Sequence, residues 1–274
     1  ARAKGIPIVE EFFGVTLAER MAKEGKSADL MVANNVLAHV PAINDFVAGF
    51  TRLLTPTGVA TFEFPHLLRL LQDVLFDTIY HEHYSYLSLI AVDRICRAAG
   101  LEVFDVETLP THGGSLRVFA QRADSGKRPR DPNVDEMLAL ETAHGLRTPA
   151  PYEKLQSAAE QVKNGFLEFL LSAKREGKQV AGYGAAAKGN TLLNFAGVKP
   201  DLLSFVVDRN PAKQGRFLPG SRIPIATEQS LREERPRYIV LLPWNLDAEL
   251  REQLGYAREW GAQFVTAVPT LTIT

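Results

Sequence analysis

Cysteine is nearly absent from this sequence of 274 residues. The single cysteine, Cys96, excludes an intrachain disulfide, and its helix-like surroundings indicate a small buried apolar residue, which favours a cytoplasmic setting. No apolar run approaches the roughly 20 residues that a membrane-spanning helix needs, and the first residues do not resemble a signal peptide. A formal net charge of −1 excludes a dominant electrostatic grip on nucleic acid, but still allows a local basic pocket for one small anion. We therefore expect neither nucleic acid nor a membrane as a partner, and the sequence does not disclose the oligomeric state.

A glycine-rich turn is also missing near the start of the chain. An open parallel sheet normally holds a nucleotide cofactor with such a turn after its first strand. Gly5 and Gly14 do not form one. A strand at 6–9 would also have few neighbours to pair with its backbone. We expect that residues upstream of Ala1 belong to the intact protein.

Short apolar, β-branched runs alternate with segments of helical period in two stretches, which predicts two Rossmann-like open-sheet α/β units. The last two strands of the first unit follow one another without a helix and predict an antiparallel pair at the sheet edge. A charged, glycine- and proline-containing segment predicts a boundary that divides the chain into 1–124 and 125–274, with a connecting helix at 152–177. Strands are predicted at 6–9, 28–33, 59–64, 101–108, 116–121, 179–183, 203–207, 238–242 and 263–268, and helices at 43–54 and 89–99.

The segment 76–86 concentrates titratable side chains, with two histidines, two carboxylates and three tyrosines in eleven residues. Histidine titrates near neutral pH and suits a general base, with Tyr80 and Glu82 available to orient an imidazole. Two other interpretations stand beside this one. The imidazoles could hydrogen-bond backbone carbonyls in a loop, or His81 and His83 could ligate a metal ion with a third ligand. The candidates for that third ligand are His39, His66 and His112.

Polar side chains also follow two predicted strands, where open α/β sheets bind their ligands. Asn34, Asn35 and His39 follow the strand at 28–33, although paired asparagines also cap turns. The second segment, 182–191, leaves a strand and enters a helix. Its glycines and Lys188 suit a phosphate, and Asp208 lies where a dinucleotide-binding domain places its ribose acceptor. The spacing departs from GxGxxG, so close packing of helix against strand is the alternative explanation for these glycines.

Taken together, these segments resemble the S-adenosylmethionine-dependent C-methyltransferases that methylate C-3 of dTDP-linked 4-keto deoxysugars. The resemblance spans essentially the whole chain. It is carried by the segments ANNVLAHV at 33–40, FDTIYHEH at 76–83, THGGSLR at 111–117, GYGAAAKG at 182–189 and DRNPAKQG at 208–215.

The resemblance implies a first unit that is a truncated class I methyltransferase sheet, and a nucleotide-sugar substrate lodged between the two α/β domains. S-adenosylmethionine is the implied cofactor. Zinc is expected only in an N-terminal module that this sequence lacks, so the activity of this chain alone is in question. The remaining alternatives are a nucleotide- or NAD-binding oxidoreductase and a non-catalytic fragment that binds a sugar nucleotide.

The resemblance also implies a role for each candidate residue. His83 is the base, Glu82 and Tyr80 orient or polarise, and His39 is either a donor to the developing oxyanion or a second proton carrier. The cofactor's methionine part is expected at Asn34 and Asn35, and its adenine at Phe12 or Phe13. The residues expected on the substrate side are His81, His112, Tyr183, Gly184, Lys188 and Asn190.

Overall fold

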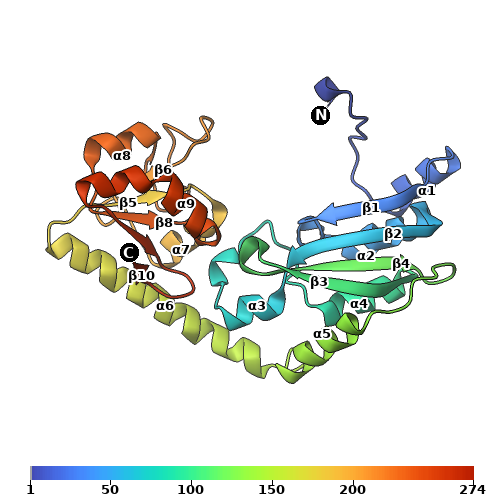
Figure 1. The fold of residues 1–274 in the computed structure, drawn as a ribbon. Helices are drawn as coiled ribbons and strands as arrows, with labels where there is room; N and C mark the ends of the chain where they lie inside the picture. The colour runs from blue at the N-terminus through green and yellow to red at the C-terminus, as the bar shows by residue number, and fades with distance from the viewer. Residues whose placement is uncertain (1) are drawn as a thin grey trace. The chain divides into compact units, whose positions relative to one another are not determined.

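A computed structural model describes residues 2–274, drawn in Figure 1. The chain forms two compact units. Unit 1 contains the chain up to Leu68 together with Glu82–Thr148, and unit 2 contains Arg69–His81 together with Pro149–Thr274. Each unit carries one open sheet with helices, which confirms the predicted α/β class.

The sheet of unit 1 has the strand order β1-β2-β4-β3. Its first two strands are parallel, and Asn34 at the end of β1 pairs with Glu63 near the end of β2. Strand β4 runs antiparallel to both β2 and β3. The predicted antiparallel pair at the edge is therefore confirmed. The strands of unit 1 are β1 (Ala28–Asn34), β2 (Leu54–Pro65), β3 (Leu101–Leu109) and β4 (Ser115–Arg122).

The strand predicted at 6–9 is wrong. These residues have no regular structure, and the side chains of Ile6 and Val9 are exposed. Within residues 2–274 no neighbouring strand pairs with them, and an apolar run alone does not satisfy backbone hydrogen bonds.

Among the helical segments of this half of the chain, η denotes a 3-10 helix. They are η1 (Arg2–Lys4), α1 (Val15–Lys23), η2 (Leu37–His39), α2 (Ile43–Leu53), α3 (Leu67–Gln72), η3 (Phe76–Thr78), α4 (Leu89–Ala98), η4 (Thr111–Gly113) and α5 (Pro132–Ala143).

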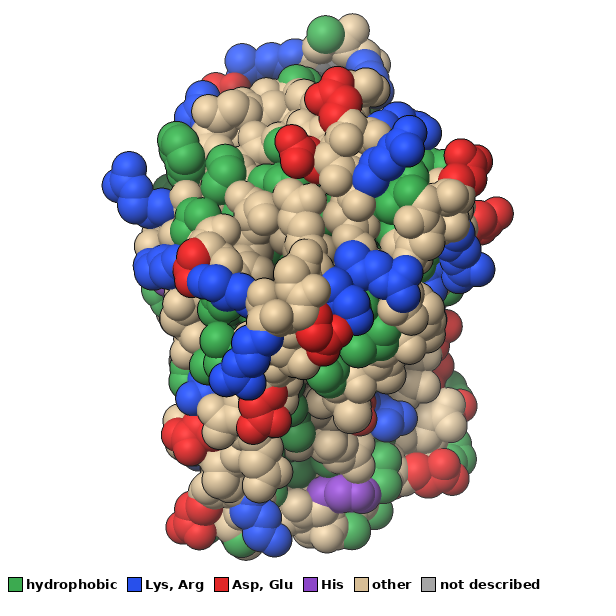
Figure 2. Space-filling view, turned by 90° about the vertical axis from the view of Figure 1, so that its left-hand side faces the viewer, with side chains coloured by type: hydrophobic (Ala, Val, Ile, Leu, Met, Phe, Trp, Pro, Cys, Tyr) green, Lys and Arg blue, Asp and Glu red, His purple; other side chains and the backbone are tan. Residues whose placement is uncertain are grey.

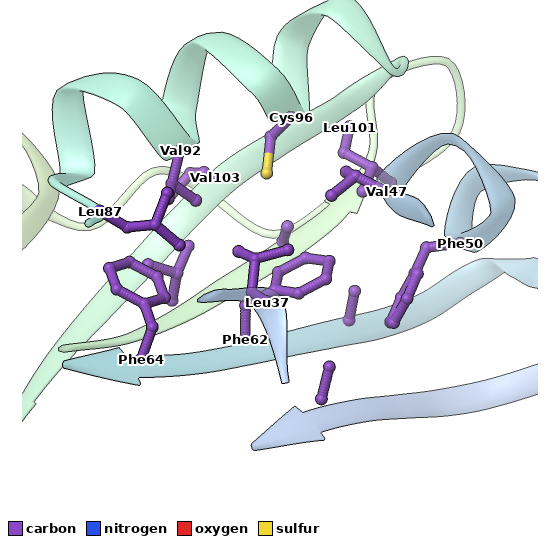
Figure 3. Packing of buried hydrophobic residues seen from close by; sticks show 14 of the residues in the cluster. Leu37, Val47, Phe50, Phe62, Phe64, Leu87, Val92, Cys96, Leu101 and Val103 are labelled. Carbon is purple, nitrogen blue, oxygen red and sulfur yellow. The ribbon is translucent and has the colours of Figure 1, made fainter. Parts of the chain in front are cut away.

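The core of unit 1 lies between its sheet and its helices. Figure 3 shows Phe62 and Phe64 of β2 facing Val92 and Cys96 of α4. Alternate residues of a strand share one face, so Phe62 and Phe64 both enter the core. Burial raises the pKa of the Cys96 thiol to about 12, as expected for an apolar packing role rather than a reactive one.

Helix α5 belongs to unit 1, so the two units divide between Thr148 and Pro149 rather than at the predicted 124/125. Val134 of α5 lies in the core of unit 1. The fully buried Glu141 accepts hydrogen bonds from the backbone N–H groups of Leu89 and Ile90 and pairs with His66. These contacts join residues far apart in sequence, and a local change in composition does not reveal them.

The sheet of unit 2 has the strand order β10-β9-β8-β5-β6-β7, with every pair parallel except β10 with β9. Since β8 and β6 flank β5 on opposite sides, the turn after β5 lies at a topological switch point, where such sheets bind ligands. The strands are β5 (Val180–Tyr183), β6 (Val206–Val207), β7 (Ile225–Ala226), β8 (Tyr238–Leu241), β9 (Gln263–Thr266) and β10 (Thr272–Ile273). The helices are α6 (Ala150–Arg175), α7 (Ala187–Phe195), α8 (Glu228–Glu234), η5 (Trp244–Leu246), α9 (Asp247–Gln253) and η6 (Gly255–Trp260).

Charge is mixed over the face drawn in Figure 2, where lysine and arginine side chains are interspersed with acidic ones. This agrees with the formal net charge of −1. Within residues 2–274, none of the helices combines the length and the apolar character needed to cross a bilayer.

Candidate functional site

The carboxyl end of β1 carries the predicted asparagines. Asn34 ends the strand, and Asn35 adopts a left-handed backbone with φ of 53°, a conformation that asparagine tolerates better than most residues. The N–H of Asn35 donates to the carbonyl oxygen of Glu63 at 2.8 Å. Both asparagine side chains are exposed at the sheet edge, and the chain then enters η2, which ends at His39.

His39 and His83 lie side by side in unit 1, although 44 positions separate them. Their ring centroids are 4.8 Å apart and both residues are half-buried. The loop that carries His83 is held to η2 by its backbone, because the N–H groups of Tyr84 and Ser85 donate to the carbonyl oxygen of Ala38 at 2.9 and 3.2 Å. The structure therefore brings together two histidines that the sequence selected independently.

The contacts of His39 define its tautomer. Its Nδ1 lies 3.0 Å from the carbonyl oxygen of Glu82, and a carbonyl oxygen only accepts hydrogen bonds. Nδ1 therefore carries a hydrogen, and in the neutral ring Nε2 presents a lone pair. A neutral His39 can accept a proton at Nε2 but cannot donate one from that atom.

The other residues of the segment differ in exposure. Tyr80 is half-buried, whereas His81 and the side chain of Glu82 are exposed. The sequence analysis did not select Tyr86, whose ring centroid lies 6.1 Å from that of His83. Among residues 2–274 no three side chains of His, Cys, Asp or Glu are grouped to hold a metal ion.

His112 lies in the turn between β3 and β4, with a left-handed φ of 58°. Glu63 of β2 holds this turn, because one of its carboxylate oxygens accepts from Thr111 at 3.2 Å and the other from Arg117 at 2.8 Å. The hydrogen bond to Glu63 raises the pKa of Arg117. No local sequence pattern marked Glu63, which lies inside a buried strand.

An apolar cavity of about 330 Å³ lies beside β1. Phe13 lines it and packs edge-on against Phe46 and Phe50, at centroid distances of 5.7 and 5.4 Å. Phe12 is fully exposed and does not line the cavity. The residues that line the cavity are Phe13, Met31, Val32, Ala33, Val36, Phe46 and Phe50.

The glycines of the turn after β5 allow close packing within unit 2. Gly184 has a φ of +88°, and a Cβ added there would lie 2.4 Å from Cγ of Pro243. A Cβ on Gly189 would lie 2.6 Å from Cβ of Leu242. Tyr183 is buried in the core, and its hydroxyl accepts a hydrogen bond from Gln253. Tyr183 and Gly184 therefore have contacts within the fold that account for them.

Lys188 lies in the first turn of α7 and is half-buried. Its Nζ donates to Asn245 Oδ1 at 3.1 Å and lies 4.4 Å from the centroid of the Trp244 ring. Burial lowers the pKa of Lys188, and the charge of Asp77 opposes that shift. Asn190 follows on the same helix, and its buried Oδ1 has no hydrogen-bond partner among residues 2–274.

The carboxylate of Asp208 is occupied by its own chain. One oxygen accepts from the N–H of Ala185 at 2.9 Å and from Lys213 Nζ at 3.0 Å, and the other accepts from the N–H of Asn210 at 2.8 Å. Burial of Asp208 opposes ionisation, but these bonds outweigh it and lower the pKa. The ribose acceptor that an NAD site needs is thus engaged, which argues against the oxidoreductase alternative.

Comparisons with known proteins agree on the class of the two units. Residues 4–106 match the family described as "Methyltransferase domain", and residues 110–269 match that described as "C-methyltransferase C-terminal domain". Both matched families consist of methyltransferase domains. The chain belongs to the C-methyltransferase family, which confirms the family predicted from the motifs.

A curated relative is the C-methyltransferase NovU of Streptomyces niveus, which is 36% identical over 269 residues. The alignment covers 98% of this chain and 64% of NovU, so the chain spans about two thirds of the length of this relative. A solved 1,6-didemethyltoxoflavin-N1-methyltransferase of Burkholderia thailandensis aligns over 35% of this chain and 44% of its own, with 21% identity and a TM-score of 0.28. The magnesium protoporphyrin IX methyltransferase of Synechocystis PCC 6803 aligns over 37% and 48%, with 16% identity and a TM-score of 0.29.

Proposed function

We propose that this protein is a C-methyltransferase that moves a methyl group from S-adenosylmethionine to an enolised carbon of a dTDP-linked 4-keto deoxysugar in the cytoplasm. The observation that carries the proposal is the pair of imidazoles formed by His39 and His83, 4.8 Å apart at the exposed end of the parallel strands. Membership of the C-methyltransferase family supports the class of reaction.

The carboxyl end of β1 suits S-adenosylmethionine. The exposed amides of Asn34 and Asn35 can bind the amino-acid part of the cofactor, and the cavity lined by Phe13 offers an apolar surface to its adenine. Phe13 is preferred to Phe12, because only Phe13 lines that cavity. When bound, the cofactor supplies an electrophilic methyl group on its sulfonium.

Methylation of carbon needs a base, because a carbon beside a ketone becomes nucleophilic only after it loses a proton. His83 is the proposed base. The tautomer of His39 supports one of the two roles expected for it. With Nδ1–H directed at the carbonyl of Glu82, a neutral His39 offers only a lone pair at Nε2, so we assign it as the second proton carrier. Glu82 contributes through its backbone carbonyl, which orients the His39 ring.

The nucleotide part of the substrate is assigned to unit 2. Lys188 offers a positive charge at the switch point of the sheet, and Asn190 offers an amide on the same helix, so both suit an anionic sugar nucleotide. Tyr183 and Gly184 support the shape of this turn from within the fold. His81 and His112 are assigned to the sugar.

Two measurements separate removal of the proton from transfer of the methyl group. Solvent deuterium incorporation into a dTDP-4-keto-deoxysugar reports the base step without the methyl donor, and mass spectrometry with S-adenosylmethionine reports the complete reaction. We expect His83→Asn to lower both rates by about 10²–10⁴-fold, and His39→Asn to lower them less. His144→Asn, on an exposed histidine at the end of α5, is the matched control. Wild-type deuterium incorporation in His83→Asn would remove His83 from the role of base.

A further inference from the structure

The segment Arg69–His81 has an unusual place in the chain. It belongs to unit 2, although unit 1 contains the sequence on both sides of it. The chain passes from unit 2 to unit 1 between His81 and Glu82, within the run of candidate catalytic residues. The two ends of that run are therefore held by different parts of the protein.

Contacts with α7 and with the turn after β8 hold this segment in unit 2. The ring of Phe76 packs edge-on against Phe195 near the end of α7, with centroids 5.4 Å apart. Asp77 is fully buried, and its Oδ2 accepts a hydrogen bond of 2.6 Å from Nε1 of Trp244. Lys188, at the other end of α7, acts on Asp77 electrostatically.

Burying the carboxyl group of Asp77 lowers the stability of the fold more than burying an apolar side chain would. Its Oδ1 is buried and has no hydrogen-bond partner among residues 2–274, and burying a polar group without a partner costs free energy. Burial raises the pKa of Asp77, opposed by the Trp244 hydrogen bond and the charge of Lys188. An apolar side chain would fill this space with a smaller free-energy penalty. The directional hydrogen bond to Trp244 therefore serves to position the segment rather than to stabilise the fold.

Asp77 lies close in sequence to the proposed chemistry. Tyr80 lies three positions after Asp77 and His83 six positions after it, which limits the reach to about 10 and 20 Å of extended chain. Beyond His83, the N–H groups of Tyr84 and Ser85 are bonded to Ala38. Tyr80 and His81 therefore follow an anchored residue of unit 2, and His83 precedes anchored residues of unit 1.

We infer that Asp77 is a positioning residue, which, through its bond to Trp244, fixes the unit 2 segment that carries Tyr80 for the proposed methyl transfer. The inference rests on the proposed function. It adds a task for two residues that never touch the reacting carbon, and it places their bond beside Lys188, the proposed contact for the nucleotide.

Hydrogen exchange tests the anchor without any need for activity. The N–H groups of Thr78 and Ile79 donate to Leu75 and Phe76 within the segment, so their exchange rates report its opening. We expect Asp77→Leu and Trp244→Phe each to speed this exchange about tenfold or more, because each removes one partner of the bond, and to leave the amides of Tyr84 and Ser85 unchanged. Asp73→Asn, in the same segment, is the control and keeps wild-type exchange. If Thr78 and Ile79 exchange at the wild-type rate in both variants, the anchor is absent and the inference fails.

Kinetics test the positioning role. We expect both variants to lower kcat by up to about 10²-fold and to leave KM for S-adenosylmethionine unchanged, because a small misplacement of a catalytic group has this scale of effect. The double variant should lose no more than the larger single loss, since both substitutions remove the same bond. Faster exchange with wild-type kcat would show a structural anchor only and overturn the positioning role. Absence of methyl transfer by the wild-type protein would overturn the proposed function. The exchange rates would still test whether the bond between Asp77 and Trp244 holds the segment.

Discussion

Replacing Glu141 by alanine is expected to destabilise unit 1 by about 3–5 kcal/mol, the scale for leaving several buried hydrogen-bonding groups without a partner. Glu141 is fully buried. It lies 2.7 Å from Nε2 of His66 and accepts from the N–H groups of Leu89 and Ile90 at 2.6 and 2.8 Å. Alanine would leave all three groups without this acceptor at the start of α4, where no backbone carbonyl replaces it.

Thiol labelling of Cys96 measures this change in unit 1 alone. Cys96 is the only cysteine and is fully buried in α4, so it reacts only when unit 1 opens. If opening is a rapid pre-equilibrium, the expected loss accelerates labelling about 10²-fold or more, because each 1.4 kcal/mol is about tenfold. Both tryptophans lie in unit 2, so urea unfolding followed by tryptophan emission should stay near wild type. Glu136→Ala, on the exposed face of α5, is the control, and equal labelling rates for the two variants would refute the reasoning.

Three further predictions follow from unit 2 and from the cavity of unit 1. Gly184→Ala should destabilise unit 2 by about 1–3 kcal/mol in urea unfolding followed by tryptophan emission, because the added methyl meets Pro243 at a φ of +88°. Because the pKa of Asp77 is raised in the folded protein, this group favours folding at low pH, and that contribution is lost as pH rises above about 3.9. In urea titrations between pH 4 and 7, the part of the free energy of unfolding that depends on pH through this group should be absent from Asp77→Asn. Phe13→Ala should weaken binding of S-adenosylmethionine about tenfold in calorimetry, whereas Phe12→Ala, on a fully exposed ring, should not change it.

The sequence predicted several strands well, because each is a short apolar run between turn residues. The predicted strands at 28–33, 59–64 and 238–242 correspond to β1, β2 and β8. The strands β7 and β10 contain two residues each, which is too short for a period of two to show, so no local pattern marks them. The apolar run at 6–9 has the pattern of a strand, but within residues 2–274 it has no strand to pair with. A strand forms only where its backbone hydrogen-bonds to a neighbouring strand.

The candidate site was predictable in kind but not in arrangement. The rule that polar residues gather at the carboxyl ends of parallel strands selected Asn34 and His39, and the density of titratable groups selected His83. The 4.8 Å between the two imidazoles depends on how η2 and the loop at 82–86 pack, which sequence spacing does not encode. The hydrogen bond between Asp77 and Trp244 joins positions 167 residues apart and left no trace in either local segment.

The titratable side chains of 76–86 serve two different purposes in our proposal, anchoring of the segment and the reaction itself. Asp77 is buried in unit 2 and turned toward Trp244, whereas His83 lies in unit 1 beside His39. The proposed anchor, a carboxyl group, and the proposed base, an imidazole, look alike in a sequence, because both are titratable. They differ in burial: Asp77 is fully buried, and His83 is half-exposed, as a group that meets substrate needs to be. A titratable cluster at a junction between two compact units therefore divides into groups that position and groups that react, and burial is the property that sorts them.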